Sequence, residues 1–322
     1  MATRLLTRLL SLPYPPEQDG RWSPVTSTID WCEENYYATI YSAEVVNTLT
    51  NLLFFHLAIK GIRNALKEGH DTVFLVGFVG YLLVGAGSFL FHATLKYPMQ
   101  LVDELSMIYT TCLMCFATFS NGRSRGHAIC VAGFLASLAV FVTGYYHFLQ
   151  DPRFHEAVYA ALTAVVVARS VYVMEVTLRP RHQRRQPGRK DSETENEAQT
   201  AVRESERDAQ ILAQMWAVVG CGLGLFLSGF VFWTIDNRYC SRLITWRRQV
   251  GLPWGILLEG HGWWHLMTGL GAYHYLVWGT WLRHCTNGRQ DEYELVWPRW
   301  NSLPAVVRSE TAAGADQQKK DV

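Results

Sequence analysis

Long apolar runs alternate with short polar segments along most of the chain. A membrane-spanning helix needs about 20 predominantly apolar residues, and seven stretches meet this requirement. The second, fourth and sixth of them lack the amphipathic pattern that a soluble helical protein needs in its surface helices. The pattern therefore predicts an all-α membrane protein, built as a bundle of seven transmembrane helices. The seven stretches cover residues 40–60, 73–92, 98–119, 127–149, 154–176, 211–235 and 257–281.

The overall composition conceals this pattern. The 322 residues are 49% hydrophobic, yet the mean hydropathy is only +0.01 because charged residues are concentrated in a few polar segments. We expect a polar N-terminal segment over 1–39, a transmembrane domain over 40–285 and a polar tail over 286–322. The charged linker 179–210 lies within the transmembrane domain, and its composition favours a disordered or partly helical segment. The near-neutral net charge of +1 gives no indication of a nucleic-acid partner.

The distribution of Lys and Arg predicts the orientation in the membrane. Segments on the N-terminal side of the seven expected spans carry nine Lys and Arg, and those on the opposite side carry nineteen. Because cytoplasmic loops are enriched in these residues, we place the N-terminus in the lumen and the C-terminus in the cytosol. Arg8 interrupts the only apolar run near the start, so we expect no cleaved signal peptide.

The C-terminal end of the sequence reads Lys319-Lys320-Asp321-Val322. Lysines three and four positions from the end resemble a dilysine retrieval signal, which a receptor reads only on a cytosolic tail. This predicts a multi-pass protein of the endoplasmic reticulum membrane, with the Golgi as a second location. A chance pair of lysines is the alternative.

The stretch Ser88–Ser106 contains ionisable groups inside apolar sequence. Such groups are costly in a membrane and often mark a functional site. A helix places Ser88 and His92 on one face, one turn apart. If Pro98 marks the turn of an antiparallel helix pair, Asp103 returns to a depth similar to that of His92. We interpret this stretch as half of a site.

The seventh expected span supplies the other half. His261 and His265 are four residues apart, the spacing at which one helix face offers two imidazoles to a metal ion. In the seven-span topology they lie at the same end of the bundle as His92. Three histidines and an open position form a catalytic zinc arrangement, and Asp103 and Ser88 lie nearby. The alternative for each histidine is a hydrogen-bonded contact between helices.

The segment before the first span is acidic. Hard cations such as Ca²⁺ take six to eight oxygen ligands from carboxylates, amides and backbone carbonyls. The spacing suits a loop around one Ca²⁺ ion, although the pattern is not that of an EF-hand; a solvated acidic loop is the alternative. The oxygen-bearing side chains are those of Asp30, Glu33, Glu34, Asn35 and Glu44.

Only two of the seven cysteines, Cys32 and Cys240, fall in expected luminal segments. An oxidising lumen would allow them to form a disulfide. Two free thiols are the alternative.

Taken together, three motifs carry a resemblance over about 30–285. They are DWCEENY with Glu44 following, GSFLFHATLKYPMQLVDELSMIY and GHGWWHLMTGLGAYHY. The chain resembles the alkaline ceramidase family, within a wider group of seven-span membrane hydrolases that includes adiponectin-receptor-like proteins. The resemblance implies an amidase that takes ceramide, dihydroceramide or phytoceramide from the bilayer and releases a sphingoid base and a fatty acid.

The resemblance also assigns roles to residues. It implies zinc ligation by His92, His261 and His265, with Ser88 and Asp103 as catalytic partners. For calcium it implies Asp30, Glu33, Asn35, Glu44 and the backbone carbonyl of Trp31. No protein partner is implied. The alternative function is a seven-span receptor with a structural zinc site, and a transporter is disfavoured because the sequence has no internal repeat.

Overall fold

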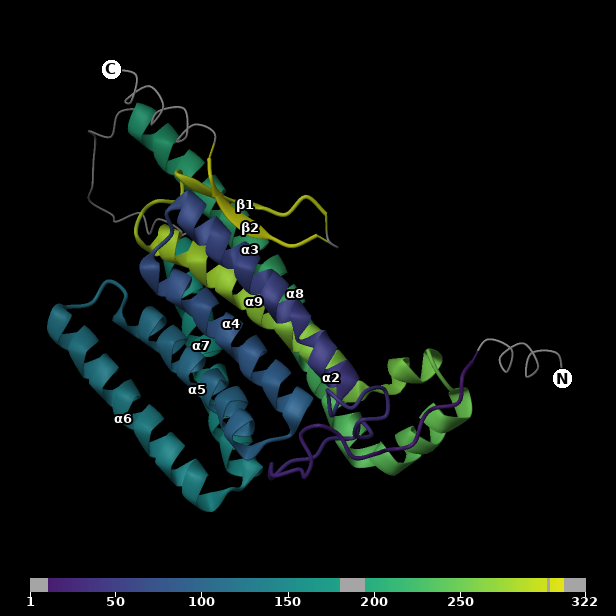
Figure 1. Ribbon diagram of the computed structural model, residues 1–322. Coiled ribbons are helices and arrows are strands. Elements are labelled where there is room, and N and C mark those ends of the chain that lie inside the picture. Colours follow the sequence, from purple (N-terminus) through teal and green to yellow (C-terminus); the bar gives the residue numbers. More distant parts are fainter. Residues whose placement is uncertain (1–10, 180–194, 300–301, 310–322) are drawn as a thin grey trace.

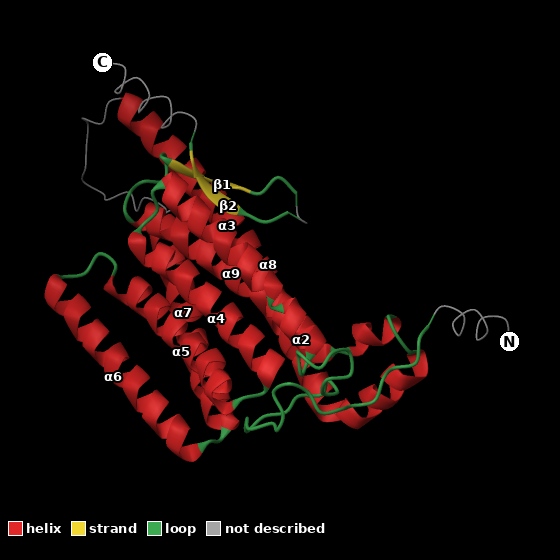
Figure 2. Cartoon of the chain, in the orientation of Figure 1, coloured by secondary structure: helices red, strands yellow, loops and turns green. Residues whose placement is uncertain are grey.

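The computed structural model describes residues 11–179, 195–299 and 302–309, with the side chains of 195–198 left out. The dilysine Lys319-Lys320 and Arg8 lie outside the described residues, as does the first half of the charged linker. The described chain is almost entirely helical (Figure 2). Its helices are α2 (Val45–Thr50), α3 (Leu52–Glu68), α4 (Thr72–Thr94), α5 (Tyr97–Ser120), α6 (Arg125–Leu149), α7 (Pro152–Leu178), α8 (Glu195–Val250), the short 3₁₀ helix η1 (Trp254–Leu258) and α9 (Gly260–Thr286).

Six helical segments of the described chain are long and apolar enough to cross a membrane. They are Val45–Glu68, which contains α2 and α3, then α4 to α7, and Gln199–Val250 within α8. These six correspond to the first six expected spans. The chain is thus a multi-pass membrane protein. The seventh expected span coincides with α9, which is not among the six.

The composition of α9 explains this difference. The helix has 27 residues, but it carries four histidines and Arg283. These polar residues lower its mean hydropathy although the helix is largely buried against its neighbours. Figure 1 shows α9 lying along α8 through the length of the bundle. Whether α9 crosses the bilayer stays a prediction.

The bundle has a closely packed centre and an outer helix. Large apolar side chains from α3 to α9, among them Phe54, Phe78 and Trp278, form the main buried cluster. In Figure 1, α6 lies at the edge of the bundle, beside α5 and away from α9. Most of its side chains are exposed, as expected of a helix that faces lipid.

The helix α8 is longer than the span expected at 211–235. It begins inside the charged linker, so the prediction of a partly helical linker is confirmed for residues 195–210. It also continues to Val250 through a segment expected to be a loop. The backbone leaves helical geometry at Tyr239 (φ −121°, ψ 23°), where the helix bends. Figure 1 shows this last part of α8 running under the N-terminal segment.

The expected polar tail contains two strands. The strand β1 (Tyr293–Val296) pairs with β2 (Ala305–Arg308) in antiparallel register, Tyr293 opposite Arg308. Tyr293 is buried and its hydroxyl donates to the carbonyl of Glu68 at the end of α3 (3.0 Å). The all-α prediction misses this hairpin, because its short strands gain their burial only against the ends of α3 and α9.

Candidate active site

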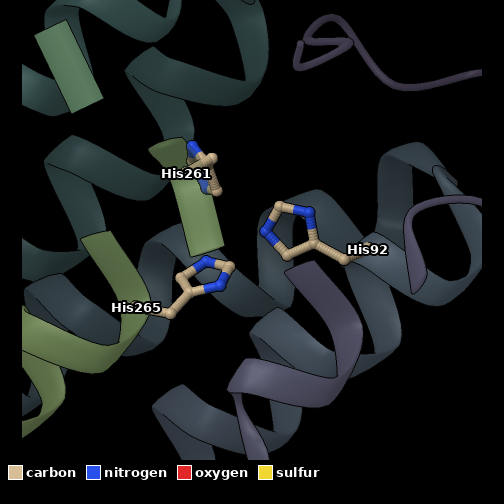
Figure 3. Close-up of side chains that lie close together, drawn as sticks. All are labelled: His92, His261 and His265. Atoms are coloured by element: carbon tan, nitrogen blue, oxygen red, sulfur yellow. The ribbon is translucent and has the colours of Figure 1, made fainter. Parts of the chain in front are cut away.

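Three histidines meet at the end of the bundle that is covered by the N-terminal segment. His92 lies near the end of α4, and His261 and His265 lie in the first turns of α9. One ring nitrogen of each lies within 4.8 Å of those of the other two, and all three side chains are buried. Figure 3 shows the three rings converging on one space. No other such group of His, Cys, Asp or Glu occurs among the described residues.

Hydrogen bonds orient two of these rings. Nδ1 of His92 contacts the carboxylate of Glu44, and Nδ1 of His265 lies 3.0 Å from the hydroxyl of Thr50 and 3.4 Å from the amide of Asn51. Metal-ligating histidines characteristically bind such a partner with the nitrogen that does not ligate. The Nε2 atoms of both rings are thereby left for the shared space.

The third ring has a different environment. Nδ1 of His261 is buried and has no hydrogen-bond partner. The indole of Trp31 packs against this ring, with centroids 4.2 Å apart. Three imidazoles that converge on one buried space are compatible with a bound transition metal, and zinc is a common choice for such a donor set.

Ser88 and Asp103 border the histidines. The Ser88 hydroxyl lies 3.4 Å from Nε2 of His265 and interacts with the carboxyl of Asp103. Gly87 makes this arrangement possible, since a Cβ there would lie 2.9 Å from Cα of Asp103. A buried carboxyl, a hydroxyl and a group of histidines that could hold a metal ion therefore lie close together.

Glu104, the neighbour of Asp103, faces the other way. Its carboxylate accepts hydrogen bonds from the Tyr146 hydroxyl and from the Gln100 amide (3.0 Å). His155 lies 2.8 Å from the Glu104 carbonyl, so His155 is a hydrogen-bonded contact between α7 and α5. Glu104 belongs to the packing of α5 against α6 and α7.

The acidic loop packs against the histidines, since Trp31 contacts the His261 ring and Glu44 contacts the His92 ring. The Asn35 amide lies 3.2 Å from both carboxylate oxygens of Asp30, and Glu44 accepts from the backbone N–H of Trp31 (3.1 Å). The structure thus brings these four residues into one loop. Their carboxylates, however, do not form a compact group comparable to that of the histidines.

Glu33 has a role in this loop that the sequence did not indicate. Its two carboxylate oxygens accept the backbone N–H groups of Val46 (2.7 Å) and Asn47 (2.8 Å), so Glu33 caps α2. The side chain is buried, and burial raises its pKa well above the usual range; the carboxylates of Glu259 and Glu44 raise this pKa further. A cation bound nearby would offset this accumulation of negative charge.

Two further connections hold the loop in place. A disulfide joins Cys32 to Cys240, near the bend of α8. Arg247, from the segment between the sixth and seventh expected spans, is fully buried and pairs with Glu259 while donating to the Cys32 carbonyl. The Tyr14 hydroxyl donates to Glu259 as well (2.7 Å). The N-terminal segment is therefore part of the fold around the site.

Sequence reasoning missed several residues of this region. Thr50, which contacts His265, is one of them. Asp236, a buried acid in α8, contacts the first residue of α9. In the sequence, Asp236 could have been noticed as an acid in the aromatic stretch FVFWTIDN, at the end of an apolar run.

Comparison with known proteins agrees with this geometry. A family model described as Ceramidase matches residues 23–307. The chain is 36% identical over 308 residues to the alkaline ceramidase YPC1 of Saccharomyces cerevisiae, covering 91% of this chain and 88% of that protein. It is 32% identical over 270 residues to alkaline ceramidase 3 of Mus musculus, covering 83% and 88%. On this evidence the chain belongs to the ceramidase family.

Proposed function

We propose that the protein is a zinc-dependent amidase that hydrolyses ceramides within the membrane to a sphingoid base and a free fatty acid. The observation that carries this proposal is the convergence of His92, His261 and His265 beside a buried acid, in a member of the ceramidase family. The two relatives named above are alkaline ceramidases. The surrounding apolar helices suit a substrate that enters from the bilayer.

The histidines and Asp103 have different roles in the proposed reaction. Zinc held by the three histidines would supply Lewis acidity to the amide carbonyl and lower the pKa of a water molecule. Asp103 is placed to accept the proton of the attacking water and to deliver it to the amide nitrogen as the C–N bond breaks. Because Asp103 delivers this proton, the nitrogen leaves as a neutral amine and not as an anion.

Ser88 is better suited to donate a hydrogen bond than to act as the nucleophile. A serine nucleophile needs an imidazole base, and the nearest imidazole, that of His265, has its Nδ1 next to Thr50 and its Nε2 facing the other histidines. The Ser88 hydroxyl can instead stabilise the oxyanion that develops from the carbonyl oxygen.

The alternative is a receptor with a structural zinc site. Closed structural sites usually fill all four positions with protein ligands. Among the described residues, no fourth His, Cys, Asp or Glu completes the histidine group. An open position favours catalysis.

Three further assignments belong to the proposal. A calcium ion is held by Asp30, Glu33, Asn35, Glu44 and the backbone carbonyl of Trp31, where it stabilises the acidic loop. The helix α9 is the seventh span, with the histidines at the luminal end and the tail 286–322 in the cytosol. The protein resides in the endoplasmic reticulum membrane, with the Golgi as a second location.

The test compares two histidines of α9 in purified protein. His265→Ala should abolish both bound zinc and the hydrolysis of a panel of ceramide, dihydroceramide and phytoceramide, because it removes one of three ligands. His274→Ala is the matched control, since His274 contacts the Leu270 carbonyl (2.8 Å) away from the site. Metal analysis and fatty-acid release are the two measurements. A full zinc equivalent in His265→Ala would contradict the assignment.

A further inference from the structure

The helical backbone is interrupted between α2 and α3, next to the histidines. The backbone N–H of Asn51 donates to the carbonyl of Thr48 (3.2 Å), three residues back. A regular α-helix would pair this N–H with the carbonyl of Asn47. That carbonyl instead accepts from side chains, namely the Asn51 amide (2.8 Å) and the Thr50 hydroxyl (3.1 Å). The interruption therefore leaves polar acceptors at the end of α2 for contacts with another helix.

A glycine of α9 allows that helix to approach the interruption closely. A Cβ on Gly262 would lie 3.1 Å from the Val46 side chain and 3.4 Å from the Thr50 side chain. Gly262 precedes His265 by three residues, so the two lie on one face of α9. The His265 ring thus reaches the end of α2. Its Nδ1 lies 3.0 Å from the Thr50 hydroxyl, and the ring also interacts with the backbone carbonyl of Asn47.

The hydrogen bonds of Thr50 indicate which ring nitrogen of His265 carries the proton. A hydroxyl has one proton to donate, and that of Thr50 is directed to the carbonyls of Val46 (2.9 Å) and Asn47 (3.1 Å). Toward Nδ1 of His265 the hydroxyl oxygen therefore accepts, and the Asn47 carbonyl can only accept. The Asn51 amide lies farther from Nδ1 (3.4 Å). Both close partners favour a proton on Nδ1, which leaves the lone pair of Nε2 for a metal ion.

We propose that Thr50 is a positioning residue for His265. Its hydroxyl accepts the Nδ1–H of the ring and so fixes the tautomer and the ring orientation in which Nε2 faces the metal. Partners that bind the second nitrogen of a metal-ligating histidine have this effect in many metal sites. The interrupted helix end supplies the acceptor, and Gly262 supplies the close approach. The proposal rests on the assignment of His265 as a metal ligand in the proposed function.

Substitutions at Thr50 separate the hydroxyl from the shape of the side chain. Thr50→Val keeps the shape but accepts no hydrogen bond. The dissociation constant for Zn²⁺ should rise about 10-fold, the lower end of the typical effect, because the Asn47 carbonyl remains as a second acceptor. The absorption spectrum of the Co²⁺-substituted protein should shift as well. Thr50→Ser keeps the hydroxyl and should retain the wild-type affinity and spectrum. Thr50→Ala also lacks the hydroxyl and should behave as Thr50→Val does, so the test does not depend on the folding of one variant.

Thr280→Val provides the matched control. Thr280 is buried near the other end of α9 from the histidines, and its hydroxyl donates to the carbonyl of Leu276 (2.8 Å). This variant loses a comparable hydrogen bond and should leave Zn²⁺ affinity and the Co²⁺ spectrum unchanged. If Thr50→Val and Thr50→Ala bind Zn²⁺ as the wild type does, or if Thr50→Ser loses as much affinity as they do, the hydroxyl does not position His265 and the proposal is wrong. Wild-type protein that binds no stoichiometric zinc would overturn the proposed function and this proposal with it, and that outcome is read from the wild type alone.

Discussion

Asp103 and Glu104 are adjacent acids that contact different parts of the bundle. Successive residues of a helix point about 100° apart, so the Ser88–Asp103 contact and the Glu104–Tyr146 contact lie on different faces of α5. The family resemblance implied Asp103, and not Glu104, as the catalytic partner. The surrounding side chains distinguish them, because Glu104 is occupied by donors from Tyr146 and Gln100.

Asp103→Asn should therefore lower kcat for ceramide hydrolysis about 10²–10⁴-fold, the usual contribution of general acid–base catalysis, while zinc remains bound. The amide keeps the shape of the acid but cannot take up the proton. Glu104→Gln should change kcat far less, since glutamine can still accept from Tyr146. Single-turnover kinetics and zinc content measure both effects. Near-normal turnover of metal-loaded Asp103→Asn would assign the base to another group.

At this scale the sequence predicted which histidines converge better than it predicted the residues that contact them. The i, i+4 pair His261 and His265 is visible in any helical projection. The partners of the rings are not, because Thr50 and Glu44 are distant in sequence from His265 and His92 and meet them only after the start of α2 packs against α9 and α4. Hydrogen-bond partners that depend on tertiary contacts leave little local signal.

At the scale of elements, the acidic loop and α2 form one unit. Glu33 satisfies the first backbone donors of α2, and Glu44 connects Trp31 to His92. A substitution at Glu33 would remove a helix cap, which typically costs about 1 kcal/mol, whether or not calcium binds there. A test of the calcium proposal therefore needs a ligand that does not cap the helix.

Asp30→Asn meets this need. Calcium added to chelated wild-type protein should raise the melting temperature and restore activity, and saturation at 100 times the dissociation constant would contribute about 2.7 kcal/mol. Asp30→Asn should weaken this response because it removes one negative charge from the site. Glu34→Gln is the control, since Glu34 lies in the same loop but pairs with Arg248. Zinc content should stay constant throughout. No effect of calcium on wild-type melting temperature or rate would leave the loop as a plain acidic segment.

Element boundaries were predicted well where hydrophobicity decided them and poorly where tertiary contacts did. The helices α4 to α7 follow the expected apolar runs closely. The continuation of α8 to Val250 depends on buried contacts of Arg247 with Glu259 and Cys32, and a sequence pattern shows that arginine only as a surface charge. The strand β1 likewise depends on the ends of α3 and α9.

At the scale of the whole molecule, the two ends of the bundle have different chemistry. The disulfide, the acidic loop and the histidines lie at one end, whereas the β1–β2 hairpin packs at the other (Figure 1). The first six spans return the chain to the side on which it started. The placement of the tail therefore depends on whether α9 crosses the membrane.

Glycosylation in microsomes tests this topology. The sequence contains no Asn-x-Ser/Thr acceptor of its own, so single acceptors can be introduced cleanly. The double change Asp19→Asn and Arg21→Thr creates one on the exposed N-terminal segment, and a second protein carries an acceptor appended after Val322. With seven spans and a luminal N-terminus, only the first protein should gain the mass of a glycan, since the modification takes place in the lumen. Glycosylation of both proteins would mean that α9 does not cross, and glycosylation of the second alone would reverse the orientation inferred from the Lys and Arg distribution.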